Sequence, residues 1–173
     1  EVREKRTFKL EKRSVGAFGS TIGVVSVGMI GRLVIESLQA HDVKVVAFDP
    51  IVPAEQIRQL GATPVSLEEL FLVSDVVSIH TPWLRETEGM VCESLMRSMK
   101  PTATLINTSR GALIDEPALC RVLEERKDLT AVLDVSYPEP PVQDSPLYAL
   151  PNVVLTPHIA GAIGPECARL GMK

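Results

Sequence analysis

The chain has 173 residues, a formal net charge of −4 and 45% hydrophobic residues, which is the composition of an ordinary globular protein. This length suits one domain with a well-buried core. The negative charge argues against a nucleic-acid-binding surface over the whole domain, and no apolar stretch approaches the ~20 residues that cross a bilayer. We therefore expect a cytoplasmic protein that binds neither nucleic acid nor membranes.

Cysteine usage and a basic amino terminus add to this description. Cys92, Cys120 and Cys167 are odd in number and lack CxxC spacing, so we expect reduced thiols. No cluster of residues at metal-ligand spacing surrounds them, and we predict no metal site. Residues 1–13 hold six Lys or Arg and three Glu, which is typical of a solvated arm or hinge segment. The domain itself is expected over residues 14–173.

Short β-branched runs alternate with helical stretches almost throughout the chain. Most of these runs are continuously apolar, as expected for strands covered on both faces. The predicted strands are Thr21–Val25, Val43–Phe48, Thr63–Val65, Asp75–Ile79, Ala103–Asn107, Thr130–Asp134 and Val153–Thr156. Such alternation predicts an α/β fold of the Rossmann type: a doubly wound parallel sheet of about seven strands with helices on both faces.

The helices between the strands are marked by capping residues and apolar stripes. Ser66 with Glu69 fits a capping box, and Asp115 before Pro117 is a good N-cap. Residues 137–151 carry five prolines and little periodicity, and are predicted to form an extended loop. Two apolar stripes indicate buried helix faces: Ile30, Leu33, Val34 and Leu38 in one helix, and Leu119, Val122 and Leu123 in another.

A glycine-containing turn joins the first predicted strand to the first helix. Residues 26–31 read Ser-Val-Gly-Met-Ile-Gly, the G-x-G-x-x-G pattern of dinucleotide-binding turns with serine at the first glycine position. In such turns the second glycine lets a pyrophosphate approach the backbone, and the third lets the helix pack closely on the strand. Gly28 and Gly31 keep these roles, whereas the side chain of Ser26 can strain the turn or crowd the cofactor.

Asp49 ends the next predicted strand, 21 residues beyond Gly28. A carboxylate at this position binds the hydroxyls of the adenosine ribose in dinucleotide-binding domains. Its charge would repel a 2′-phosphate, and Pro50 and Ile51 offer no arginine to accept one. These residues favour NAD over NADP. The alternative is an ordinary glycine-containing βα turn, with Asp49 only capping its strand.

Three charged or titratable side chains follow the ends of later strands: Arg110, Glu139 and His158. Reduction of a 2-oxo acid moves a hydride to the carbonyl carbon and develops negative charge on its oxygen, which a nearby cation and a proton donor stabilise. Arg110 can bind two carboxylate oxygens at once. Glu139 beside His158 would favour the imidazolium form and hold the ring. Taken singly, each is as easily a solvated loop residue.

The order and spacing of these segments resemble the nucleotide-binding domain of the D-isomer-specific 2-hydroxyacid dehydrogenases. The resemblance covers roughly residues 14 to 170. It implies that Arg110 binds the substrate carboxylate and carbonyl, that His158 is the acid/base residue, and that Glu139 is its partner. The segments that carry the resemblance are Ser26–Gly31, Asp75–Pro82, Met99–Pro101, Leu105–Gly111, Leu133–Val135, Glu139–Pro140 and Pro151–His158.

The resemblance also implies the residues that bind NAD. His80 is expected near the adenosine side, with a purely structural role as an equal alternative, and Asp134 near the nicotinamide carboxamide. The implied cofactor-binding residues are Ser26, Gly28, Met29, Ile30, Gly31, Asp49, His80, Thr81, Pro82, Thr108, Ser109, Arg110, Asp134, His158 and Gly161.

Members of this family have a second domain, which forms the other side of the substrate cleft. We therefore expect this chain to be the cofactor domain of a longer enzyme, with NAD as cofactor, a small 2-oxo or 2-hydroxy acid as substrate, and a homodimeric assembly. The chain alone would then turn over substrate poorly or not at all. The most specific interpretation is an enzyme similar to glyoxylate/hydroxypyruvate reductases. Two alternatives are a non-enzymatic NAD-sensing module, similar to the C-terminal-binding-protein corepressors, and a degenerate relative in which Ser26 impairs cofactor binding.

Overall fold

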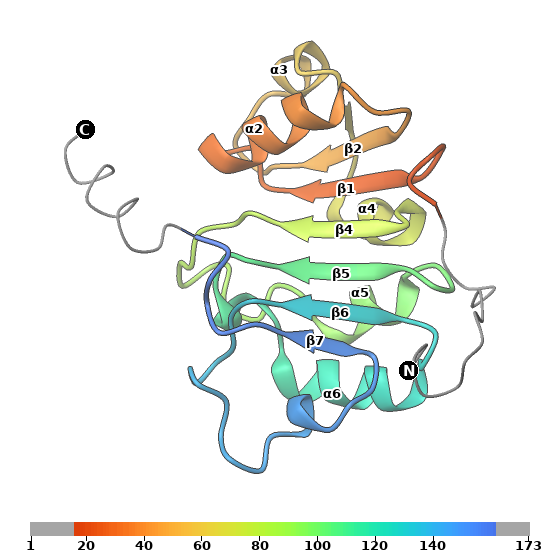
Figure 1. The fold of residues 1–173 in the computed structure, drawn as a ribbon. Helices are drawn as coiled ribbons and strands as arrows, with labels where there is room; N and C mark the ends of the chain where they lie inside the picture. The colour runs from red at the N-terminus through yellow and green to blue at the C-terminus, as the bar shows by residue number, and fades with distance from the viewer. Residues whose placement is uncertain (1–15, 162–173) are drawn as a thin grey trace.

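The computed structural model describes residues 16–161 as a seven-stranded sheet flanked by helices (Figure 1). The strand order is β3-β2-β1-β4-β5-β6-β7, and every neighbouring pair is parallel. This confirms the predicted doubly wound Rossmann-type sheet. The strands are β1 (Thr21–Val25), β2 (Lys44–Phe48), β3 (Thr63–Pro64), β4 (Val76–Ile79), β5 (Thr104–Asn107), β6 (Thr130–Leu133) and β7 (Val153–Leu155).

Helices cover both faces of the sheet, as predicted (Figure 1). On one face Ile35 and Ile57 pack with Val24 and Ala47 of the central strands. On the other face the helices between β3 and β6 bury a larger apolar cluster. The first face carries α2 (Met29–Leu38) and α3 (Ala54–Gln59); the second carries α4 (Leu67–Val73), α5 (Glu93–Ser98) and α6 (Glu116–Glu125). Two short 3-10 helices are η1 (Gly111–Leu113) and η2 (Pro146–Tyr148).

Several strands are one residue shorter than predicted, because the residue at the end serves a neighbouring loop. Asp75 lies before β4, where its carboxylate accepts a hydrogen bond from the backbone N–H of Thr21 at 2.8 Å. Asp134 lies after β6 and accepts hydrogen bonds from the backbone of Ile159 and Ala160. The predicted strand ends were wrong at Val43, Val65, Asp75, Ala103, Asp134 and Thr156.

The predicted apolar stripe of helix α2 is confirmed for Val34 and Leu38, which pack against the core, but not for the other two residues. Ile30 and Leu33 are each 58% exposed, whereas Gly31 and Ile35 are buried. A Cβ on Gly31 would lie 2.1 Å from the carbonyl oxygen of Ser26, so only glycine lets the helix approach the strand this closely. The helix faces the sheet with Gly31 and Ile35, so the prediction that Ile30 and Leu33 are buried was wrong.

The predictions for α4 and α6 are confirmed. The Ser66 hydroxyl accepts a hydrogen bond from the N–H of Glu69 at 3.1 Å. Asp115 accepts one from the N–H of Ala118 at 3.0 Å and so caps the first turn of α6. The three stripe residues of this helix, Leu119, Val122 and Leu123, are all buried.

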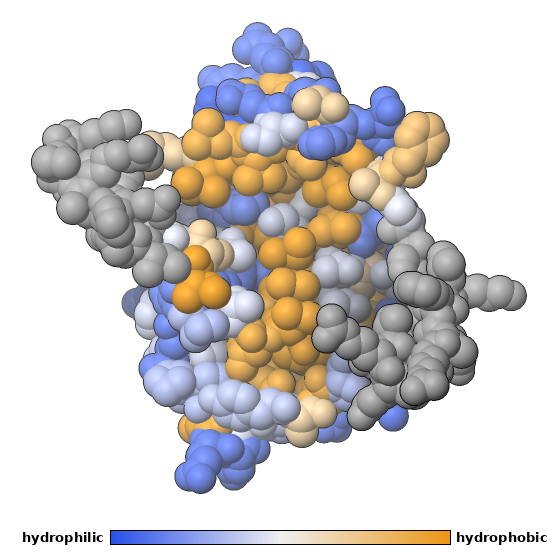
Figure 2. Space-filling view, in the orientation of Figure 1, coloured by the Kyte–Doolittle hydropathy of each residue, from blue (hydrophilic) through white to orange (hydrophobic). Residues whose placement is uncertain are grey.

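The sheet face that carries α2 is only partly covered. Ile106, Val132 and Val154 are in register with Val24 and point to the same side. Within residues 16–161 no helix covers these three, and Val154 is 50% exposed. Figure 2 shows apolar side chains gathered over the middle of the sheet on the face in view. An exposed apolar surface of this kind marks an interaction site.

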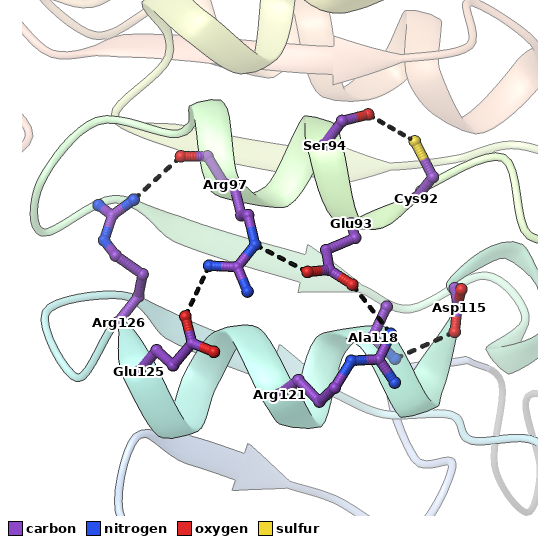
Figure 3. A network of polar contacts seen from close by, with 9 residues as sticks. All are labelled: Cys92, Glu93, Ser94, Arg97, Asp115, Ala118, Arg121, Glu125 and Arg126. Atoms are coloured by element: carbon purple, nitrogen blue, oxygen red, sulfur yellow. Dashed lines mark hydrogen bonds and ion pairs between the residues drawn. The ribbon is translucent and has the colours of Figure 1, made fainter.

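An ion-pair network joins α5 to α6 on the other face (Figure 3). Arg97 contacts Glu93 at 2.8 Å and Glu125 at 2.7 Å, and Arg121 contacts Glu93 at 2.9 Å. The hydrogen bonds from Arg121 and Arg97 lower the pKa of Glu93, and that from Arg97 lowers the pKa of Glu125. Because these side chains are exposed, solvent screens each pair. The network connects two helices and lies away from the strand ends.

Three remaining expectations concern metals, membranes and cysteines. The described part of the chain holds no group of His, Cys, Asp or Glu that could bind a metal ion. None of its helices is long and apolar enough to cross a membrane. Cys92 and Cys120 are free thiols. Cys167 and the basic residues 1–13 lie outside the described residues.

We predict that Asp115→Ala lowers the free energy of unfolding by about 1 kcal/mol, because the first turn of α6 loses its capping acceptor. Asp115→Asn keeps a capping oxygen and should stay near the wild-type value. Urea unfolding followed by circular dichroism measures both variants. Equal stability of the alanine variant and the wild type would contradict the capping role.

Candidate functional site

The loops that follow the strands meet at one edge of the sheet, because all seven strands are parallel. The strand order reverses between β1 and β4, and ligands bind α/β sheets at such a switch point. A cavity of about 650 Å³ lies there. Its walls come from the loops after β1, β4 and β5: Gly28, Met29, Ile30, His80, Thr81, Pro82, Trp83, Thr108, Ser109 and Arg110. Nine of the predicted site residues are thus brought together.

The turn after β1 presents open backbone to this cavity. A Cβ built on Gly28 has no atom within 4 Å, so the space beside this backbone is free. Gly28 is the N-cap of α2, no side chain caps it, and the first turn holds no acidic residue. The first N–H groups of the helix therefore remain available to an anion. These features fit the diphosphate of a dinucleotide.

Ser26 adopts a backbone conformation that normally belongs to glycine. Its φ is +74°, in the left-handed region, so the expectation of a strained turn holds. The side chain does not crowd the cavity, because it points elsewhere: its hydroxyl lies 2.8 Å from the hydroxyl of Thr81. Ser26 is 7% exposed and is not among the cavity walls.

Asp49 lies directly after β2 and is bound by backbone N–H groups. Its Oδ2 accepts from Val27 at 2.8 Å, and its Oδ1 accepts from Ile51 at 2.8 Å and Val52 at 2.9 Å. Burial raises the pKa of Asp49, but these hydrogen bonds and the charge of Arg32 together outweigh burial and lower it. The carboxylate stays ionised and links two loops. It does not line the 650 Å³ cavity, so a ribose contact stays a prediction.

His80 and Trp83 form the part of the cavity wall that follows β4. The Nε2 atom of His80 lies 2.9 Å from the hydroxyl of Ser78, and burial lowers the pKa of His80, which keeps the imidazole neutral. Trp83 is 45% exposed and contacts the ring of Tyr137 edge to face, with centroids 5.3 Å apart. Trp83 is the single tryptophan of the chain, which makes it a reporter of this cavity.

Asn107 fixes the loop that carries Arg110. This fully buried residue ends β5, and its amide donates to the carbonyl of Arg110 at 2.8 Å. Its Oδ1 accepts from the N–H of Ser109 at 3.0 Å, and the Ser109 hydroxyl donates to the carbonyl of Ile79 at 2.7 Å. Sequence reasoning gave Asn107 no role. Its signal is an asparagine that ends an apolar strand, where the side chain can close a turn two residues on.

Gly111 lets the Arg110 loop touch the segment after β6. A Cβ on Gly111 would lie 2.0 Å from the backbone carbon of Ser136, a contact that no side chain can make. Any substitution must therefore push the two loops apart. Gly111 belongs to a segment that carries the family resemblance. The contact with Ser136 explains why this residue must be glycine, which the sequence alone does not show.

His158 and Glu139 form a direct pair, as predicted. The Nδ1 atom of His158 lies 2.6 Å from Oε1 of Glu139, and the two side chains are 45% and 42% exposed. They line a second cavity of about 620 Å³ beside the proline-rich loop. Because Nδ1 contacts the carboxylate, Nε2 is the ring nitrogen that stays available for another hydrogen bond.

Asp134 holds the loop that carries His158. Its carboxylate accepts from the Thr156 hydroxyl at 2.5 Å and from the N–H groups of Ile159 at 2.9 Å and Ala160 at 2.8 Å. Its carbonyl accepts from the N–H of His158 at 2.9 Å. Burial raises the pKa of Asp134, but these hydrogen bonds outweigh burial and lower it. These hydrogen bonds also hold the backbone of His158 at a φ of +54°, which residues other than glycine rarely adopt.

Not all predicted residues share one wall. Arg110 lines the first cavity, whereas His158, Glu139 and Asp134 line the second. Gly31 is buried under the turn, and Gly161 is the last described residue and exposed. The structure therefore brings the predicted residues together in two groups at the same edge of the sheet.

Comparison with known proteins assigns the chain to a family. Residues 1–160 match the model described as D-isomer specific 2-hydroxyacid dehydrogenase, NAD binding domain. The chain belongs to this family. Its cofactor is NAD, and the open backbone at Gly28 and the uncapped start of α2 fit that cofactor.

Individual relatives agree with this assignment. The chain is 37% identical over 154 residues to D-3-phosphoglycerate dehydrogenase of Archaeoglobus fulgidus, covering 89% of this chain and 29% of the relative. It is 41% identical over 145 residues to glyoxylate reductase of Korarchaeum cryptofilum, covering 84% and 44%. The NAD-dependent formate dehydrogenase of Staphylococcus aureus, solved with NAD, is 34% identical with a TM-score of 0.74, covering 82% and 42%. The chain thus spans less than half the length of these relatives.

We predict that Asp134→Asn lowers the free energy of unfolding by about 1–3 kcal/mol at pH 7, because an NH2 donor replaces one of the two carboxylate oxygens that accept hydrogen bonds from the N–H groups of Ile159 and Ala160. The folded-state pKa of Asp134 is lowered, so its contribution exists above the ordinary value of 3.8 and disappears as the pH falls through the folded value. The stability difference between wild type and variant should therefore narrow below pH 3.8.

Urea unfolding at several pH values measures this difference. Asp144→Asn, at an exposed position in the proline-rich loop, is the matched control and should change little. A difference that stays constant from pH 7 to pH 3 would contradict the role given to the Asp134 carboxylate.

Proposed function

We propose that this chain is the cofactor domain of an oxidoreductase that transfers a hydride between NAD and C2 of a small 2-hydroxy or 2-oxo acid. The observation that carries the proposal is the 2.6 Å contact between His158 and Glu139, at the same sheet edge as the open turn at Gly28. An oriented imidazole beside a nicotinamide site is the arrangement that acid/base catalysis of carbonyl reduction needs. Membership of the family supports the same reaction class.

The cofactor is bound mainly by backbone groups in this proposal. The N–H groups at Met29 and Ile30, at the start of α2, hold the diphosphate beside Gly28. Asp49 has one acceptor site left after its three backbone hydrogen bonds, and this site accepts a ribose hydroxyl. Residues Thr108 and Ser109 form the wall on the β5 side. When bound, NAD supplies or accepts the hydride.

His158 is the proposed acid/base residue. The Glu139 carboxylate holds Nδ1 and so orients the ring, while Nε2 exchanges a proton with the oxygen on C2 of the substrate. Asp134 keeps the histidine backbone in place through hydrogen bonds on both sides of it. His158 is therefore pre-oriented before substrate arrives.

Arg110 is the proposed binding group for the substrate carboxylate and carbonyl. Its Nη1 donates to the carbonyl of Ser109 at 2.6 Å, and no ion-pair partner for it lies within residues 16–161. The rest of the guanidinium can bind carboxylate oxygens in a planar fork. Its charge also stabilises the negative charge that develops on the carbonyl oxygen during reduction.

The remaining parts of the proposal concern the rest of the enzyme. The chain covers less than half of its relatives, so we propose that a second domain completes the cleft and selects the substrate side chain. We also propose a homodimer. The exposed apolar face around Val132 and Val154 supports an interface with further protein surface. By analogy with the glyoxylate reductase relatives, the proposed reaction is the reduction of a small 2-oxo acid such as glyoxylate.

In the full-length protein, we predict that His158→Gln lowers kcat for a 2-oxo acid by about 10²–10⁴-fold, because the proton donor is lost. NADH binding should stay within a few-fold of wild type. Steady-state kinetics and calorimetric titration measure the two effects. His41→Gln, at an exposed position before β2, is the control and should retain activity.

Two results would contradict this proposal. Full activity of the His158 variant would remove the histidine from catalysis. Absence of turnover by the full-length wild type with any small 2-oxo acid, with NADH binding intact, would favour a non-enzymatic NAD-sensing module.

We predict that the chain binds NADH at least about tenfold more tightly than NADPH, because the ionised Asp49 carboxylate repels a 2′-phosphate. Asp49→Asn should narrow this ratio, while Glu55→Gln on α3 should leave it unchanged. Calorimetric titration with both nucleotides measures the ratio. Tighter binding of NADPH than NADH by the wild type would contradict the role of Asp49.

A further inference from the structure

A pair of hydroxyl groups lies at the wall of the NAD cavity: one belongs to a residue of the wall, and the other lies behind it. Ser26 follows β1 and Thr81 follows β4, and their side-chain oxygens are 2.8 Å apart. The two residues are 7% and 4% exposed. Their contact therefore connects the nucleotide turn with the neighbouring strand end across the switch point of the sheet.

We propose that Ser26 is a positioning residue that orients the Thr81 hydroxyl toward NAD. Ser26 donates its proton to Thr81, and the Thr81 proton is then directed into the cavity, where it donates to a phosphate or ribose oxygen of the cofactor. This inference rests on NAD binding at the β1–β4 cavity and gives Ser26 an indirect role in that site.

A count of protons supports this direction. Two hydroxyls that share one hydrogen bond hold two protons, of which one lies between the oxygens and the other stays free to donate. In residues 16–161 neither hydroxyl has another hydrogen-bond partner. Thr81 lines the cavity, whereas Ser26 does not. With Ser26 as donor, the free proton reaches the cavity; with Thr81 as donor, it would stay buried without an acceptor.

The backbone of Ser26 supports the same inference. Its φ of +74° favours glycine, so a serine at this position is strained. Glycine would relieve that strain and would serve the turn at least as well. The serine can improve the site only through its side chain, and the partner of that side chain is Thr81.

The test is a double-mutant cycle in NADH binding. NADH is titrated against the chain, and quenching of the Trp83 fluorescence reports occupancy of the same cavity. Ser26→Gly should weaken NADH binding about 3- to 10-fold while the melting temperature stays equal or rises. Thr81→Val should weaken binding by a similar factor, and the double variant no more than either single one.

Two further variants check that the hydroxyl is responsible. Ser26→Ala keeps the Cβ and the strain but lacks the hydroxyl, so it should lose affinity as Ser26→Gly does. Thr81→Ser keeps the hydroxyl and should bind NADH nearly as wild type. Thermal unfolding of every variant separates loss of affinity from loss of folded protein.

Several outcomes would overturn the inference. One is Ser26→Gly binding NADH as tightly as wild type or more tightly, as expected of a simple turn residue. Another is multiplication of the two single effects in the double variant, which would show that the residues act independently. Absence of NADH binding by the wild type would overturn the cofactor site together with this inference. An inactive full-length enzyme with the expected cycle would instead overturn hydride transfer alone.

Discussion

The parallel register of the seven strands is the constraint on which the site depends. Because every strand points the same way, the loops after β1, β4 and β5 converge on one cavity. The same register brings Glu139, after β6, within 2.6 Å of His158, after β7. An antiparallel β7 would carry His158 to the opposite edge of the sheet. The common direction of the strands therefore determines where the polar groups meet.

A second layer of order comes from polar side chains at the strand ends. Three side chains accept hydrogen bonds from backbone N–H groups of a functional loop: Asp49 after β2, Asn107 at the end of β5 and Asp134 after β6. Asp49 holds the nucleotide turn, Asn107 the Arg110 loop and Asp134 the His158 loop. Each side chain satisfies donors that would otherwise remain unpaired near the core. The loops are thus anchored to the sheet before a ligand binds.

Much of the fold and of the site could be predicted from local patterns. Continuous apolar runs located every strand, and the charged residues after them located Arg110 and the His158–Glu139 pair. What sequence reasoning missed depends on contacts between distant residues. The close approach of α2 to the turn after β1 depends on the contact of Gly31 with Ser26, and Gly111 must be glycine because of its contact with Ser136. Periodicity cannot show such contacts, because they depend on how elements pack.

The most direct test of the NAD site is an amide NMR titration of the isotopically labelled chain with NADH. Binding at the carboxyl ends of β1, β4 and β5 should give the largest chemical-shift changes at the amides of Gly28, Ile30, Thr81 and Ser109. The amides around a cavity of about 560 Å³ at the other end of the strands, near Thr102 and Asn152, should change little. Changes gathered at that opposite edge, with none at the turn after β1, would contradict the central claim.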